Sequence, residues 1–575
     1  MHLFASCSKL RFIVIVPAML AAARMAAEAP VPSESAAAFA ADVAPYLSAE
    51  AVKGQPPVGL DSSHAMIAGA TNPLAVHAGY EVLRRGGTAV DAALTTALAQ
   101  VALNDGANVS YAGVLVAVGF DAATKRVYSL NAAYNTVRGE TSSLTIPVEE
   151  RSGRMVLVPG FMAGVQALHD RFGKLPFPDL FAPAIWVAEH GVPFDNILAD
   201  ALRSQAKIVT RTPEGARIFK KPDGSLYRAG ELFRQPDLAA TLRAVAREGA
   251  GYMYHGPWAR HCVDQVQAAG GKLALEDLEN YRALWSEPAR TTYHGFAVAG
   301  VGPPNLGSEI QIDALTIAEV ADLRRFGKPS QPEALYYRVQ IRRAAEAEVH
   351  NRAHRPGDLI DAGLAQRLWD RIARNETRHD QAPVMTPHTT SVVAIDPQGN
   401  VVVLLHTINT FAWGTTGIFV DGVSIPDSAR IQRDAVAKAG PGSRLPDPGC
   451  PLLVLHGGKP VLASAATGYA IPAVMFGHVL DFVDSATKPL PSLQMPYPRG
   501  RRVHPATRAE AQEEVFGEGD LSTATIERLR AQGLSIAIGR RLEQASEWVG
   551  IAIDASSGTL SGAASRGING SVEGF

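Results

Sequence analysis

The chain has 575 residues, of which 47% are hydrophobic and 19% are charged, and its formal net charge is −2. Such a composition is typical of a globular protein with a large buried core and excludes a disordered or fibrous chain. The near-zero charge provides no broad basic surface for nucleic acid or anionic lipid, so we expect no nucleic-acid partner and favour chemistry on small molecules.

The first thirty residues have the pattern of a secretory signal peptide. Lys9 and Arg11 precede an apolar stretch over residues 12–23, and Ala27-Glu28-Ala29 supplies the small-x-small pattern that signal peptidases cleave after. The apolar stretch is too short to span a bilayer comfortably. We therefore predict that residues 1–29 are removed and that the mature protein is periplasmic or secreted, without a stable membrane anchor.

The pattern of apolar and turn residues predicts a mixed α and β chain. No linker or low-complexity segment divides it, which favours one interwoven unit. The remaining cysteines, Cys262 and Cys450, lie in no CxxC motif, and we expect two unpaired buried thiols. In chain order, we predict helices over 72–84, 89–103, 160–172, 183–189, 238–248, 258–269 and 335–354, and strands over 114–120, 126–130, 391–396, 401–409 and 452–456.

One predicted hairpin is a candidate site because polar residues lie at its open end. If its turn is centred on Gln398, antiparallel pairing sets Thr389 opposite Thr407, since each lies nine positions from the centre. Asn409 then falls at the end of the second strand, where a binding site could use it. Two threonines in buried strands also fit an ordinary role as strand formers, so the hairpin alone does not establish a site.

The motifs in and around this hairpin are more specific than its geometry, because they resemble those of a known family. His388-Thr389-Thr390-Ser391, Asp396, Gly399-Asn400 and Thr407-Ile408-Asn409 resemble the nucleophile segment of the γ-glutamyltransferase family. Other short motifs keep the family's order over nearly the whole mature chain: Asn72-Pro73-Leu74-Ala75, Gly86-Gly87-Thr88-Ala89-Val90-Asp91-Ala92-Ala93, Val158-Pro159-Gly160, Gly173-Lys174-Leu175-Pro176, Pro303-Pro304 and Gly562-Ala563. Collinear agreement of this length is hard to reach by chance.

The resemblance implies a fold and a maturation reaction. The fold would be α+β, the four-layer αββα sandwich of N-terminal-nucleophile hydrolases with a helical periphery. The chain would cleave itself between His388 and Thr389, giving a large subunit of residues 30–388 and a small subunit of residues 389–575. The two pieces would stay together as a heterodimer of one chain's own subunits.

The resemblance also implies the roles of individual residues. Thr389 would be the catalytic nucleophile, with its new α-amino group as the base. Thr407 matches the family's second threonine, which orients the nucleophile. Asn409 matches a substrate-contacting asparagine, and Gly468 matches the second glycine of a pair whose backbone amides stabilise the oxyanion. No metal or organic cofactor is implied.

Several positions depart from the family pattern in the substrate pocket. The arginine that clamps the substrate α-carboxylate is absent from residues 130–135, and Arg138 is a nearby substitute that is equally well explained as a surface residue. The family's paired serines are replaced at Asp447 and the proline after it. Asp427 is the nearest counterpart of the acid that receives the substrate amino group, and Thr467 replaces the first oxyanion glycine.

These departures leave three hypotheses open. The first is an enzyme that cleaves or transfers a γ-glutamyl-type amide, such as glutathione, through an acyl-enzyme. The second is a diverged amidase or acylase with another acyl group, and the third is a processed but inactive binding protein. Retention of Thr389, Thr407 and Asn409 argues against the third, because chemistry and recognition reside in different residues. The expected partner in the first two is a small-molecule amide or peptide.

The helix predicted over 335–354 carries residues of the types that bind metals. His350 and His354, with Glu346 and Glu348, have the i, i+4 spacing of metal ligands. No further ligand is evident and the segment is rich in arginine, so we expect no metal there.

Overall fold

The structure is a computed structural model, and it describes residues 39–47, 56–148, 151–352, 357–376, 389–468, 470–498, 500–503, 512–539 and 546–575. The predicted signal segment, His354 and His388 lie outside these ranges. No helix in the described ranges is long and apolar enough to cross a membrane.

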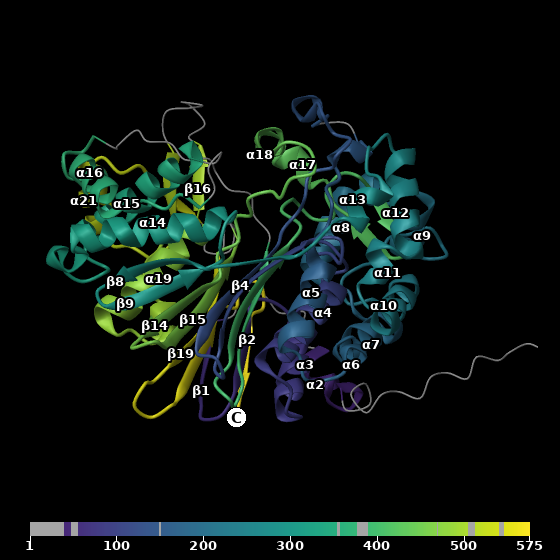
Figure 1. Ribbon diagram of the computed structural model, residues 1–575, viewed down its shortest axis with the longest axis horizontal. Helices are drawn as coiled ribbons and strands as arrows, with labels where there is room; N and C mark the ends of the chain where they lie inside the picture. Colours follow the sequence, from purple (N-terminus) through teal and green to yellow (C-terminus); the bar gives the residue numbers. More distant parts are fainter. Residues whose placement is uncertain are drawn as a thin grey trace, which may run out of the picture.

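Two seven-stranded antiparallel sheets form the centre of the molecule (Figure 1). The first has the order β1-β20-β19-β15-β14-β9-β8, and the second has the order β21-β2-β10-β11-β3-β4-β7. The strands of the first sheet are β1 (Val58–Ser62), β8 (Ala289–Tyr293), β9 (Phe296–Gly300), β14 (Leu452–His456), β15 (Lys459–Thr467), β19 (Glu547–Ile553) and β20 (Leu560–Ala564). Those of the second are β2 (Met66–Gly69), β3 (Val114–Asp121), β4 (Arg126–Ala132), β7 (Leu284–Ser286), β10 (Thr390–Ile395), β11 (Val401–Thr407) and β21 (Ser571–Gly574).

Both faces of the central strands are buried, and alternate residues serve different cores. Along β10, Val393 and Ile395 face the core between the sheets, where they join Leu453 and Ile551 of the first sheet. Their neighbour Val392 faces the opposite way, into the core under the helices. This alternation explains why the strands have continuous apolar runs rather than alternating polar and apolar residues.

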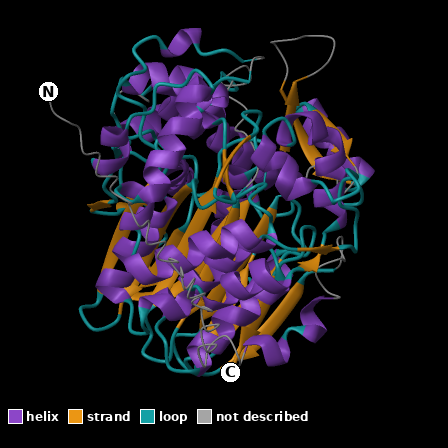
Figure 2. Ribbon diagram, turned by 90° about the vertical axis from the view of Figure 1, so that its right-hand side faces the viewer, coloured by secondary structure: helices purple, strands orange, loops and turns teal. Residues whose placement is uncertain are grey.

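Helices cover the outer face of each sheet, which gives four layers (Figure 1), and the view turned by 90° shows helices in front of the strands (Figure 2). On the second sheet lie α2 (Ala44–Leu47), α3 (Pro73–Arg84), α4 (Ala89–Leu103), α5 (Phe161–Phe172), α6 (Phe177–Leu180), α7 (Ala182–His190), α10 (Pro236–Glu248), α11 (Gly251–Tyr254), α12 (Pro257–Ala268) and α13 (Leu275–Glu279). On the first lie α14 (Leu306–Ala321), α15 (Pro332–Asn351), α16 (Ala362–Ala373), α19 (Ile471–Ser485) and α20 (Pro489–Ser492). The predicted α+β class and αββα layering are therefore confirmed.

Smaller elements complete the periphery. They are helices α8 (Asn196–Val209), α9 (Pro213–Phe219), α17 (Ser428–Ile431), α18 (Arg433–Ala439) and α21 (Thr523–Ala531), and strands β5 (Val192–Pro193), β6 (Leu232–Phe233), β12 (Ile418–Val420), β13 (Val423–Ile425), β16 (Gly500–Val503), β17 (Gln512–Gly517) and β18 (Ile536–Gly539). Three short 3-10 helices span Ser143–Thr145, Gly153–Met155 and Leu323–Phe326. The small peripheral sheets β5-β6, β12-β13 and β16-β17-β18 were not among the elements predicted from the sequence, and most of their strands have only two to four residues, which carry little periodicity. Cys262 and Cys450 are buried and unpaired, as expected.

The turn between β10 and β11 fixes the register of the central hairpin. Asp396 accepts hydrogen bonds from the backbone N–H groups of Gln398 and Asn400, each at 3.0 Å, and from the Asn400 side chain at 2.9 Å. It also accepts from the N–H of Ala89 at 3.0 Å, which ties the turn to the start of α4. One aspartate therefore holds the hairpin closed and anchors it to the covering helix.

Candidate active site

The predicted nucleophile lies at the entrance to the central hairpin. Thr389 directly precedes β10, and the register Thr390↔His406 to Ile395↔Val401, continued by one residue, sets Thr389 opposite Thr407. The predicted register is confirmed. Both threonines are buried, with 9% and 1% of their surface exposed. The pairing of β11 with β3 and of β10 with β2 embeds this end of the hairpin in the sheet.

Thr407 is joined to Asn409 immediately after its strand ends. The backbone N–H of Asn409 donates to the Thr407 hydroxyl at 3.0 Å. Asn409 has a φ of 52°, in the left-handed region that asparagine tolerates better than most residues. The chain therefore leaves the extended conformation of β11 at Asn409, two residues after the strand ends.

The other sheet reaches the same place through the end of β15. The Thr467 hydroxyl donates a hydrogen bond to the backbone carbonyl of Thr389. Gly468 follows with a φ of 103°, a conformation that only glycine adopts without strain. Thr389, Thr407, Asn409 and the Thr467-Gly468 pair, which the sequence predicted as one site, are therefore brought together where the two sheets meet.

A buried polar network that the sequence analysis missed lies behind the hairpin. The hydroxyls of Thr390 and Thr71 are 2.8 Å apart, and the Gln100 amide donates to the Thr71 carbonyl at 3.1 Å. Gln100 also lies 2.9 Å from Nε2 of His406. Burial lowers the pKa of His406 to about 3, so the imidazole is neutral and Nε2 donates to the Gln100 carbonyl oxygen. These residues are distant in sequence, and no motif connects them.

Asp447, one of the departures from the family pattern, holds Asn409 in place. Its carboxylate accepts from the Asn409 side-chain nitrogen at 2.8 Å and from the Gly449 backbone N–H at 2.7 Å. Asp447 is 1% exposed, and burial raises the pKa of its carboxyl group. Because the Asn409 nitrogen is bound to Asp447, its carbonyl oxygen is left as the acceptor for another group.

A half-buried arginine, Arg444, contacts the segment from which the family's clamping arginine is missing. Its guanidinium donates to the Asn135 side chain at 2.6 Å, to the Asn131 carbonyl at 2.5 Å and to the Arg282 carbonyl at 2.6 Å. It also lies 4.8 Å from the centre of the Tyr281 ring. Burial lowers the pKa of Arg444, but a guanidinium stays charged at neutral pH. Arg444 lies three residues before Asp447, which departs from the family pattern, but no sequence pattern predicted its contact with residues 131–135.

Arg138, the substitute predicted from the sequence, makes its ion pair at the surface. It forms an ion pair with Glu276 at 2.9 Å, and the two side chains are 51% and 67% exposed. This is the geometry of a surface ion pair. Arg444 rather than Arg138 therefore brings a positive charge to residues 131–135.

Asp427, the candidate acceptor of a substrate amino group, is fully buried. Its oxygens accept from the hydroxyls of Thr410 and Thr415 at 2.5 and 2.7 Å and from Arg430 at 2.6 Å. A carboxylate offers about four acceptor directions, so these bonds leave roughly one for a further donor.

The metal pattern considered on α15 is used in ion pairs. Glu346 accepts from Arg342 at 2.8 Å, and Glu348 lies 3.2 Å from Arg352. These arginines occupy the carboxylates that a metal would need.

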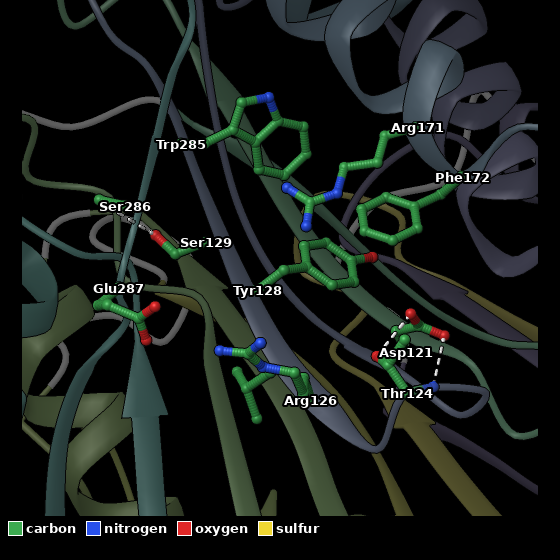
Figure 3. Close-up of a pocket in the computed structure, with 11 residues that line it drawn as sticks. Asp121, Thr124, Arg126, Tyr128, Ser129, Arg171, Phe172, Trp285, Ser286 and Glu287 are labelled. Carbon is green, nitrogen blue, oxygen red and sulfur yellow. Dashed lines mark hydrogen bonds between the residues drawn. The ribbon is translucent and has the colours of Figure 1, made fainter.

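A separate open cavity of about 400 Å³ lies at the other end of β4 (Figure 3). The guanidinium of Arg171 lies 4.5 Å from the centre of the Trp285 ring, and Tyr128 stacks on Phe172 at 4.1 Å. On β4 the cavity is lined by residues 126–129, toward the end where Arg126 pairs with Asp121, whereas Ala132, which pairs with Leu115, lies at the end near the hairpin entrance. The predicted site residues do not line it.

The fold and the hairpin define an N-terminal-nucleophile hydrolase architecture, and comparison with known proteins agrees. The structure superposes on the crystal structure of a cephalosporin acylase from Bacillus halodurans with a TM-score of 0.76 and 21% identity, covering 91% of this chain and 98% of that one. A similarity at this identity shows the shared fold alone.

Sequence comparisons then identify the family. The family model for gamma-glutamyltranspeptidase matches residues 75–574, so the chain belongs to the γ-glutamyltranspeptidase family and is an enzyme of the hydrolase and acyltransferase type. The chain is 30% identical to a glutathione hydrolase proenzyme of Bacillus subtilis over 268 residues, which is 44% of each chain and less than half the length of that relative. It is 28% identical to the acylase ACY 1 proenzyme of a Pseudomonas species over 433 residues, covering 69% of this chain and 75% of that one.

Proposed function

We propose that this protein is a self-processing amidase whose nucleophile is Thr389. The observation that carries the proposal is the position of Thr389 at the strand start, opposite Thr407, with its carbonyl held by Thr467. The maturation step would be an attack of the Thr389 hydroxyl on the carbonyl carbon of His388. The C–N bond breaks, the nitrogen becomes a free α-amino group, and water hydrolyses the resulting ester to leave a carboxylate on His388.

The two products, residues 30–388 and 389–575, would remain one heterodimer. Strands β10 and β11 of the small subunit lie between β2 and β3 of the large subunit. Separating them would expose the apolar faces of these strands on both sides, which opposes dissociation strongly. Cleavage at Thr389 would therefore free an amine without loosening the sheet.

Catalysis would use the new amine as the base. The Thr389 hydroxyl attacks the substrate amide carbonyl as its proton passes to the α-amino group, which then protonates the departing amine. Water or an acceptor amine attacks the acyl-enzyme in the second half of the reaction. Thr407 would orient the nucleophile, and the backbone amide of Gly468 would stabilise the oxyanion.

The acyl donor we propose first is a γ-glutamyl-type amide, with glutathione as an example. Arg444 supports it, because a cation contacts residues 131 and 135, where the family's carboxylate clamp would lie. Asn409 would present its carbonyl oxygen to the substrate, since Asp447 holds its nitrogen.

A second candidate is an amide whose acyl group carries no free amino group. The three bonds that Asp427 makes within the protein favour it, because they leave a substrate ammonium group roughly one acceptor direction on that carboxylate. L-γ-Glutamyl-p-nitroanilide and glutaryl-p-nitroanilide differ only in that amino group. Their ratio of kcat/KM on the processed protein separates the two candidates.

The test of the nucleophile compares Thr389→Ala with Ser391→Ala. Ser391 is buried, and its hydroxyl has no hydrogen-bond partner among the described residues, so its loss should leave processing and activity intact. Thr389→Ala should stay one chain by mass spectrometry and release no p-nitroaniline. A Thr389→Ala protein that is cleaved and active would refute the assignment, and a processed wild type that releases no amine from either substrate would favour an inactive binding protein.

The place of action we propose is the periplasm or the exterior of the cell. The proposal rests on the signal-peptide pattern of residues 1–29. N-terminal sequencing of protein recovered from a periplasmic or culture fraction should begin near residue 30.

A further inference from the structure

Three potential metal ligands meet at the base of the second sheet, far from the hairpin entrance. Asp42 lies just before α2, and His77 and Glu81 are separated by one turn of α3. One ligand atom from each of the three side chains lies within 4.8 Å of the others. Figure 1 shows α2 and α3 together near the carboxyl end of the chain, where β21 ends. The i, i+4 spacing places His77 and Glu81 on the same face of the helix.

The orientation of His77 points to a ligand rather than to an ordinary buried histidine. Its Nδ1 lies 3.0 Å from the Glu573 carboxylate, which can only accept when ionised, so Nδ1 donates. The opposite nitrogen, Nε2, is buried and has no hydrogen-bond partner among the described residues. Because the side chain is only 7% exposed, solvent does not readily supply one. The ring also stacks on Tyr46 at 4.3 Å.

The Asp42 carboxylate does not satisfy this nitrogen. Nε2 lies 4.0 Å from the Asp42 carboxylate, beyond hydrogen-bond distance. A proton on Nε2 would remain unbonded in a buried position, which is costly. Burial lowers the pKa of His77, but the carboxylates of Glu573, Glu81 and Asp42 raise it on balance, so a proton and a metal ion would compete for Nε2. Proteins orient a metal-binding imidazole in this way, with one ring nitrogen held by a carboxylate and the other turned to the metal.

We propose that Asp42, His77 and Glu81 bind one divalent transition-metal cation such as Zn²⁺, with Glu573 orienting His77. An imidazole and two carboxylates suit this class of ion, whereas Mg²⁺ and Ca²⁺ prefer oxygen ligands alone. Ligand atoms in a tetrahedral zinc site lie about 3.3 Å apart, given bonds of about 2.0–2.1 Å. Asp42 is largely exposed and Glu81 is partly exposed, so their side chains can rotate to close the remaining gap.

The ion would clamp the segment 39–47 to α3. In the processed enzyme that segment and α3 belong to the large subunit, while Glu573 belongs to the small one. The metal would therefore stabilise the start of the large subunit at a contact with the small subunit. It would take no part in the chemistry at Thr389, so its test is independent of the proposed amidase activity.

The experiment uses the full-length protein without an affinity tag, stripped with a chelator and titrated with ZnCl₂ by isothermal calorimetry. We expect one saturable site and a rise in melting temperature with zinc, because an ion that binds only the folded state stabilises it. Asp42→Asn and Glu81→Gln should each weaken binding by more than about tenfold, and Glu573→Gln by about 10- to 100-fold. Asp264→Asn, an exposed change on α12, is the matched control and should bind zinc as the wild type does.

The ligand variants change exposed or partly exposed side chains, so folding should survive them even if a His77 variant does not fold. Circular dichroism of each variant checks this point. The proposal is overturned if the wild type shows no saturable zinc binding. It is equally overturned if Asp42→Asn and Glu81→Gln both bind zinc like the wild type, since the ion would then lie elsewhere.

Discussion

Replacing Asp447 by asparagine tests how the site holds Asn409. The carboxylate accepts from two donors, the Asn409 side chain at 2.8 Å and the Gly449 backbone at 2.7 Å. An asparagine of the same shape offers one oxygen and one NH₂ group, so one of the two donors would face another donor. The substitution therefore breaks one bond and leaves a buried polar group unpaired.

The size of the effect follows from these contacts. A hydrogen bond to a charged group contributes roughly 1.5–3 kcal/mol, and an unpaired buried donor costs about 1–3 kcal/mol. Part of this is recovered because burial already disfavours the ionised Asp447, whose pKa it raises. We expect the free energy of unfolding to fall by about 2 kcal/mol. We also expect kcat/KM to fall by about 10- to 100-fold, because Asn409 positions the Thr407 hydroxyl through its backbone N–H.

The assay combines urea denaturation with p-nitroanilide turnover and includes a reciprocal rescue. Asp447→Asn together with Asn409→Asp exchanges donor and acceptor, so the double variant should recover most of the lost stability if the two side chains bond as described. Activity need not recover, since residue 409 would then present a charge to the substrate. Unchanged stability and kcat/KM in Asp447→Asn would refute the reasoning. So would a double variant whose loss of unfolding free energy equals the summed losses of the two single variants.

Three further predictions address other parts of the site and the fold. Thr407→Val keeps the shape but removes the hydroxyl beside Thr389, and kcat should fall by about 10- to 100-fold in the p-nitroanilide assay, whereas wild-type turnover would contradict its orienting role. Gly468→Ala places a side chain at a φ of 103°, so it should lower the free energy of unfolding by about 1–3 kcal/mol and remove most of the activity. Gly558→Ala is the control: its φ is 75° and its side chain would enter open space, so it should lower stability alone. Burial raises the pKa of Glu309 from 4.5 to about 7, so its contribution to stability is full below about pH 4.5 and is lost as the pH rises through 7. In urea titrations from pH 4.5 to 8, Glu309→Gln should therefore lose about 3 kcal/mol less stability than the wild type. An unchanged pH profile would contradict the shift.

The sequence predicted those parts of the molecule that depend on local order. The hairpin register followed from the position of its turn, because residues equidistant from Gln398 pair across antiparallel strands. The helices before and after the Arg85-Gly86-Gly87 break were found from apolar spacing, and the structure gives α3 and α4 there. In each case the signal lies within about twenty residues of the chain.

The contacts that complete the candidate site could not be predicted in the same way. Asp447 bonds Asn409 across 38 positions, and Arg444 reaches Asn131 across 313. Such pairs depend on how distant segments cross, which no periodicity encodes. Proximity in the sequence therefore suggested Arg138 as the substitute, although this arginine pairs with Glu276 at the surface.

This division between local and distant contacts has a consequence for how specificity can change in such a fold. Thr389 and Thr407 flank strands whose side chains alternate between two cores, so a shift of register by one residue would invert every buried face. Asp427, Arg444 and Asp447 lie instead on the connections between β13 and β14, where a side chain can be replaced without moving a strand. If Thr389 is the nucleophile as we propose, the packing of both sheets constrains the chemistry, whereas the proposed recognition residues lie on segments that tolerate substitution. This architecture permits residues 427, 444 and 447 to depart from the family pattern while the residues of the central hairpin are retained.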